Sequence, residues 1–196
     1  MQASQSKNAA SRRRGACLLL LLLLLGMLPV ARAQTEEAPL PRPAWLFLQL
    51  GGNAGAVSAT VGAGWALGWQ RETRWGPLDS RLEFSMGRWR SDGTPGEPRH
   101  RTSQLGLMPL LRLRPPGWWP GWGIEAGIGV DLLNPAYQRA HKRFSTRYNF
   151  GEQLGLVYQA GAAHELSLRL QHDSNAGLRK PNPGENFLQL RYAYRL

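Results

Sequence analysis

The feature that most constrains this chain is an apolar side chain at every second position, a pattern that recurs from residue 45 to the C-terminus. The clearest case is VGAGWALGW at 61–69, where Val, Ala, Trp, Leu and Trp alternate with Gly or Ala. A period of two predicts β-strands with two unlike faces. We expect eight strands, near 45–51, 61–69, 81–87, 102–113, 122–131, 146–158, 164–174 and 186–196. Segments of about ten residues can cross a bilayer at a tilt, and no helical span competes with them.

Two β architectures fit the alternation. A soluble lipocalin-type barrel would keep the apolar rows inside for a ligand, whereas a transmembrane barrel turns them toward lipid. Connections after the first, third, fifth and seventh strands are on average longer and more polar, as outer-membrane barrels prefer. Aromatic residues also gather where an interfacial girdle would lie, namely Trp118, Trp119, Trp122, Tyr192 and Tyr194. We therefore predict an all-β fold, an eight-stranded antiparallel transmembrane β-barrel with both termini in the periplasm.

The first 33 residues read as a secretory signal peptide, with four early basic residues, a leucine run at 18–25 and Ala31-Arg32-Ala33 before the cleavage point. The mature chain, 34–196, then forms one domain. Cys17 is the single cysteine and lies inside the signal, so the mature chain has no thiol or disulfide chemistry.

Charge narrows the choice of partners. Removing the signal lowers the basic count from 24 to 19 against 13 acids, so the formal net charge falls from +11 to +6. For an exported protein this excess favours a phosphorylated lipid surface, and the chain has no nucleic-acid-binding motif. His100, His141 and His164 lack metal-ligand spacing, and we expect no metal and no cofactor.

A histidine and a serine continue the apolar face of the strand expected at 164–174. Leu166, Leu168 and Leu170 alternate, and the next positions of that parity are His172 and Ser174. If the leucines face lipid, strand geometry carries this pair outward as well, near the external leaflet. The substrate should then be a lipid. H-x-S alone is a weak signal, and the turn-rich segment that follows is also typical of a simple loop.

Serine esterase chemistry needs a nucleophile, a base, a group that holds the base, and donors for the oxyanion. His172 and Ser174 are close enough for a hydrogen bond on one face of a strand. Glu185 has inward parity, but the preceding Pro183-Gly184 could bend the strand and return this acid to the imidazole. Asn175, Asn182 and the backbone N–H groups around Gly177 are the local candidates for oxyanion donors.

The segment LQHDSNAGLRKPNPGENFLQLRYAY, with FSTRYNFGEQLGL and HELSLR upstream, resembles the lipid A 3-O-deacylase family, the PagL-type outer-membrane acyl hydrolases. The resemblance covers about 144–196. It implies an eight-stranded outer-membrane barrel that hydrolyses the 3-O-linked acyl ester of lipid A with a Ser-His-Glu triad facing lipid. Carried over by position, Ser174 is the nucleophile, His172 the base and Glu185 the acid. Asp173 and the terminal Leu196 depart from the family pattern, and the register of the acid varies by one residue.

The implied partners are lipid A or lipopolysaccharide and the outer membrane, and we also consider a homodimer. A non-enzymatic barrel and a lipid A acyltransferase are the alternative functions. Basic residues on the predicted external loops either bind lipid A phosphates or form a solvated rim; they are Arg88, Arg90, Arg99, Arg101, Arg139, Lys142, Arg143, Arg179 and Lys180. Ion pairs inside the barrel are expected from Arg81, Glu125, Asp131 and Arg169.

Overall fold

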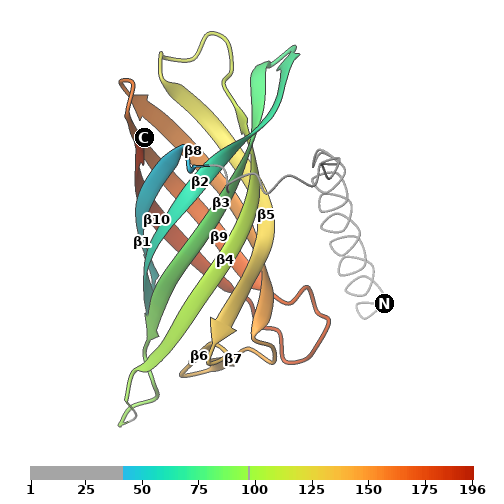
Figure 1. Cartoon of the computed structure of the whole chain (residues 1–196). Coiled ribbons are helices and arrows are strands. Elements are labelled where there is room, and N and C mark those ends of the chain that lie inside the picture. Colours follow the sequence, from blue (N-terminus) through green and yellow to red (C-terminus); the bar gives the residue numbers. More distant parts are fainter. Residues whose placement is uncertain (1–41, 97) are drawn as a thin grey trace. The chain divides into compact units, whose positions relative to one another are not determined.

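The described residues of the computed structural model, 42–96 and 98–196, form a closed barrel of eight antiparallel strands (Figure 1). The predicted signal peptide, 1–33, lies outside the described residues. Within the described part of the chain, no helix is long and apolar enough to span a membrane.

The described residues contain ten strands, of which eight build the barrel. They are β1 (Trp45–Asn53), β2 (Ala56–Thr73), β3 (Gly76–Ser91), β4 (His100–Leu113), β5 (Trp122–Asn134), β8 (Tyr148–Ala160), β9 (His164–Ser174) and β10 (Glu185–Arg195). The short strands β6 (Gln138–Arg139) and β7 (Lys142–Arg143) form a separate hairpin. The barrel closes by pairing β1 with β10, and all eight predicted strands are confirmed. β2 and β3 run beyond their predicted ends; residues 70–73 of β2, for example, pair with 76–79 of β3 although they lack an apolar alternation.

The apolar rows lie on the outside. Leu166, Leu168 and Leu170 are 43%, 49% and 54% exposed, while the residues between them are buried in the interior. The same alternation holds along β1 and β10. A soluble barrel would bury these leucines, so the structure excludes that alternative and defines a transmembrane barrel.

The interior is filled by paired charges. Arg169 bonds Glu83 at 2.9 Å and Glu125 at 2.7 Å, and Arg191 bonds Glu83 at 2.6 Å. Arg112 joins Glu125 at 2.7 Å and also contacts Glu165. Each of these buried charges thus has partners of opposite sign, the condition under which such charges are tolerated.

The predicted interior ion pairs are confirmed for three residues and wrong for one. Glu125 and Arg169 pair with each other, and Arg81 bonds Asp79 at 2.9 Å. Asp131 is instead hydrogen-bonded to the Gln104 side-chain amide, because the residues opposite it on β4 and β8 are uncharged.

The two ends of the barrel differ. Residues 92–96, 98–99, 135–147 and 175–184 lie between strands at one end of the barrel, which we call the loop end; it carries the β6–β7 hairpin (Figure 1). Trp45, the first residue of β1, pairs with Arg195, the last residue of β10. The first and last strand residues of the barrel therefore lie at the opposite end, which we call the terminal end. The connections at the loop end are longer on average, as predicted, although the one after β1 is a tight turn in which Asn53 accepts from the Gly55 N–H at 2.9 Å.

Aromatic side chains support both ends. At the loop end Trp89 packs against Tyr137 and Phe187, and Tyr137 packs against Phe144, in one buried cluster. At the terminal end the aromatic residues of the predicted girdle lie on the surface; Trp118, Trp119, Tyr192 and Tyr194 are all exposed. The inner cluster closes the mouth of the barrel, whereas the outer aromatics lie where a bilayer interface would be.

Candidate active site

His172 and Ser174 lie on the outward face of β9, in the row begun by Leu166, Leu168 and Leu170. Both side chains are half-buried, in contrast to the exposed leucines of the same row. β9 runs between β8 and β10, and its last residue, Ser174, begins the 175–184 loop. The strand therefore delivers the pair to the rim of the barrel, at the loop end.

Asn186 holds the His172 ring. It is the direct partner of His172 across β9 and β10, and its Oδ1 lies 2.6 Å from Nδ1 of the imidazole. An amide oxygen can only accept, so this contact places the ring proton on Nδ1 and leaves the Nε2 lone pair available. Nε2 is then the acceptor nitrogen of this ring.

Glu152 lies on the other side of His172. It is the direct cross-strand partner of His172 on β8, and it is half-buried on the same outward face. Directly opposed residues have Cβ atoms about 5 Å apart, which brings the carboxylate into the electrostatic range of the imidazole.

Glu185 faces the interior, and its predicted outward turn is wrong. Its carboxylate pairs with Arg139 at 3.0 Å and Lys142 at 3.4 Å, and it accepts from the Asn53 side-chain amide at 3.0 Å. The Pro183-Gly184 pair does not re-aim it, because Glu185 enters the ladder at once, opposite Asp173, and keeps inward parity. Glu185 thus fixes the β6–β7 hairpin from inside and does not hold the imidazole.

Glu185 also affects Tyr137, which lies in the aromatic cluster at the mouth of the barrel. Burial, and then the negative charge of Glu185, raise the pKa of the Tyr137 phenol. Tyr137 therefore stays neutral in the aromatic cluster, which suits its fully buried position between Trp89 and Phe144.

The predicted site-support residues come together in the 175–184 loop. The Asn175 backbone N–H donates to Asn182 Oδ1 at 3.0 Å, and the Gly177 N–H donates to Asn175 Oδ1 at 2.9 Å. Ala176 between them has a φ of 53°, and its N–H donates to Ser174 Oγ at 3.3 Å. A left-handed alanine is unfavourable and is typical of functional turns. The donors of Asn175 and Gly177 are used within the loop, so these two residues shape it.

Gly184 makes room for the imidazole. A Cβ built at this position would lie 2.6 Å from His172 Cε1, and the residue has a φ of 64°. Both the space and the backbone conformation require glycine. The His172 ring therefore lies against the start of β10, next to Asn186.

Sequence reasoning missed Asn186 and Glu152. The signal that could have found them is register, since both are outward residues opposite His172 on its two neighbouring strands. No group of three or more potential metal ligands occurs among the residues that the structure describes.

The fold and the site define a transmembrane β-barrel with a serine–histidine pair on its outer surface. The family model described as lipid A 3-O-deacylase (PagL) matches residues 57–195, and the chain belongs to this family. It is a protein of the bacterial outer membrane.

Two known proteins are similar to the chain. Lipid A deacylase PagL of Bordetella bronchiseptica is 36% identical over 122 residues, which span 61% of this chain and 64% of that protein. The crystal structure of the outer membrane enzyme PagL superimposes with a TM-score of 0.65 at 22% identity, covering 78% of this chain and all of that one. At this identity the superposition supports the fold.

Proposed function

We propose that the protein hydrolyses the 3-O-linked acyl ester of lipid A, with Ser174 as nucleophile and His172 as general base. The observation that carries the proposal is the 2.6 Å contact between His172 Nδ1 and Asn186 Oδ1, on the face that also carries Ser174. Membership in the lipid A 3-O-deacylase family supplies the substrate class and the bond that is cleaved.

The reaction proceeds through an acyl-enzyme. His172 Nε2 takes the proton of Ser174 as Oγ attacks the ester carbonyl. The tetrahedral intermediate collapses, the bond to the sugar oxygen breaks, and His172 returns the proton to that oxygen. Water then attacks the acyl-serine with His172 again as base, which releases the hydroxy fatty acid and regenerates Ser174.

Two different residues orient the His172 imidazole and stabilise the positive charge that forms on it. Asn186 orients the imidazole, as the asparagine does in the Cys-His-Asn sites of papain-like proteases. An amide carries no charge, so it cannot neutralise the imidazolium that forms. Glu152, opposite His172 on β8, supplies the negative charge on the same face.

The oxyanion is stabilised by the 175–184 loop. Asn182 uses its Oδ1 as an acceptor toward the Asn175 N–H, which leaves its amide NH₂ as the donor group. Asn175 and Gly177 hold the loop in shape around it. Removing one oxyanion donor costs about 10²- to 10³-fold in turnover in a well-studied protease.

The position of the site matches a lipid substrate. The exposed leucines of β9 and β10 lead directly to His172 and Ser174, so an acyl chain lying along them reaches the nucleophile without leaving the membrane. The loop end faces the exterior, where long connections of outer-membrane barrels lie. The homodimer stays a hypothesis, because neither the comparisons nor this single chain supports it.

Mass spectrometry of lipid A tests the function. The chain is expressed in a Gram-negative host whose lipid A keeps its 3-O-acyl chain, beside a Ser174→Ala control. Loss of one hydroxyacyl mass with the wild type alone supports hydrolysis. A gain of one acyl mass would show an acyltransferase, and unchanged lipid A would show a non-enzymatic barrel.

A further inference from the structure

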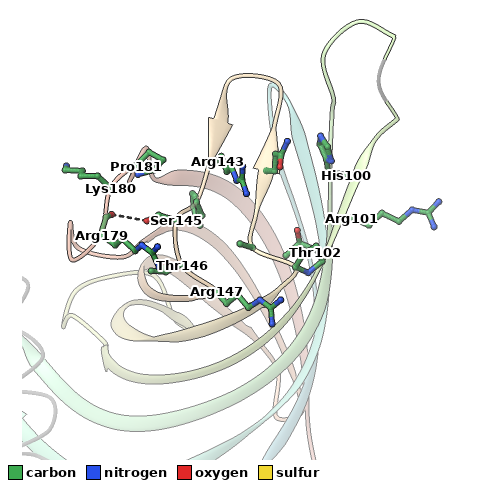
Figure 2. Close-up of a pocket in the computed structure, with 14 residues that line it drawn as sticks. His100, Arg101, Thr102, Arg143, Ser145, Thr146, Arg147, Arg179, Lys180 and Pro181 are labelled. Atoms are coloured by element: carbon green, nitrogen blue, oxygen red, sulfur yellow. Dashed lines mark hydrogen bonds between the residues drawn. The ribbon is translucent and has the colours of Figure 1, made fainter.

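A cavity of about 750 Å³ opens at the loop end, between three segments that are distant in sequence (Figure 2). One wall is the start of β4, the second is the 135–147 connection, and the third is the 175–184 loop. This volume lies within the range of small-molecule sites, about 300 to 1,000 Å³.

The lining of the cavity is strongly basic. It includes Arg101, Arg143, Arg147, Arg179, Lys180 and His100, and no acidic residue is among the described residues that line it. Two neighbouring cations, Arg139 and Lys142, instead point to Glu185 below. Basic residues of all three segments line one cavity, although Figure 2 shows Arg101 directed away from it, and this concentration of positive charge distinguishes the cavity from a rim of isolated surface charges.

The cavity is joined to the site. Ser145, a lining residue, donates to the Arg179 carbonyl at 3.0 Å and accepts from the Asn175 side-chain amide at 3.0 Å. Asn175 also donates to the Arg179 carbonyl at 2.8 Å and directly follows Ser174. These bonds fix the basic wall to the residue next to the nucleophile.

We infer that this cavity binds the phosphorylated sugar head group of the lipid whose acyl chain is presented to Ser174. Guanidinium groups bind phosphate oxygens in pairs, and the lipid-facing leucines accept the chains of the same molecule. The head group is thus anchored above the membrane while the ester reaches the barrel surface. The inference rests on the proposed function and names the part of the substrate that the enzyme recognises.

Steady-state kinetics in detergent micelles test the inference with two matched substrates. One is bisphosphorylated lipid A and the other is the same lipid with both phosphates removed. We expect Arg143→Gln/Arg179→Gln to raise KM for the phosphorylated lipid about tenfold and to leave kcat within about twofold, a loss typical of charge-assisted contacts. On the phosphate-free lipid the double variant and the wild type should have the same KM. Equal changes on both lipids, or none, would overturn the inference.

Arg99→Gln is the matched control. Arg99 is an exposed loop arginine that pairs with Asp92 at 3.3 Å and does not line the cavity. It should behave as the wild type on both lipids. A KM increase as large as that of the double variant would reassign the effect to general surface charge and overturn the cavity.

A binding measurement separates this inference from the proposed function. Ser174→Ala protein is titrated with the two lipids, with and without the two arginine substitutions. Preference for the phosphorylated lipid that depends on the arginines supports the cavity even if the wild type releases no fatty acid. Equal binding of both lipids, or displacement of the lipid by inorganic phosphate at the same concentration, would refute head-group recognition while leaving hydrolysis intact.

Discussion

The two faces of β9 and β10 do different work. Inward, Arg169 and Arg191 are fully buried and paired with acids from other strands. Outward, the same strands carry leucines and then His172, Ser174 and Asn186. Side-chain alternation separates the two sets completely, so the inner face stabilises the barrel while the outer face is available for chemistry.

The adjacent pair Glu185 and Asn186 shows the separation at a single peptide bond. Glu185 points inward and fixes the β6–β7 hairpin through Arg139 and Lys142. Asn186 points outward and holds His172. Chemical type alone would favour the carboxylate as the partner of the imidazole, but the face of the strand decides the contact.

The largest effect is expected at the outer face. Ser174→Ala should lower deacylation on the order of 10³-fold or more, because it removes the proposed nucleophile. Its unfolding midpoint in urea should match the wild type, since the side chain is half-buried and its hydroxyl accepts a long 3.3 Å hydrogen bond from the Ala176 N–H. Wild-type turnover by this variant would contradict the mechanism.

Arg169→Met should have the opposite profile. It removes one of the two arginines that pair with each of Glu83 and Glu125, and breaking a buried ion pair costs about 3–5 kcal/mol. Equilibrium unfolding in detergent measures the loss, and turnover per folded molecule should be unchanged. A stable but inactive Arg169→Met protein would show that the two faces are coupled.

Asn186 should matter for turnover and not for stability. Asn186→Ala removes the acceptor from His172 Nδ1, and we expect kcat to fall about 10- to 100-fold with KM unchanged, a smaller loss than for the buried acid of serine proteases. Asn186→Asp keeps the acceptor oxygen and should restore kcat, which a merely structural role would not explain. If Asn186→Ala retains full kcat, Asn186 does not position the base.

Glu185→Gln should have the smallest effect on chemistry. We expect kcat within about threefold of wild type, because the side chain lies on the face opposite His172. Losing its charge weakens the contacts to Arg139 and Lys142, so limited proteolysis should cut 135–147 faster. A loss of kcat as large as that of Asn186→Ala would restore Glu185 as the acid.

Much of this molecule could be predicted from strand parity. Alternation identified the eight strands, the outward leucines and the outward direction of His172 and Ser174, because a period of two fixes the face of every residue in a regular strand. It also gave Glu185 its inward direction, which the structure has. The error was to expect a local bend at Pro183-Gly184 that would overrule parity.

Strand parity does not determine the register, that is, which residues of neighbouring strands lie opposite one another. Asn186 and Glu152 lie opposite His172 because of the register in which β10 and β8 pair with β9. That alignment depends on the geometry of the 161–163 and 175–184 connections, which a hydrophobic pattern does not encode. The basic cavity was equally hidden, since its three walls are joined only by the closed barrel.

The pairing of β1 with β10 closes the barrel on the strand that carries Asn186. The final strand, β10, closes the barrel against β1, and its second residue, Asn186, contacts His172. Until that strand is inserted, the nascent protein has neither a sealed wall nor an oriented base. The strand that seals the wall is therefore also the strand that orients the imidazole, so barrel closure and completion of the candidate site depend on the same element.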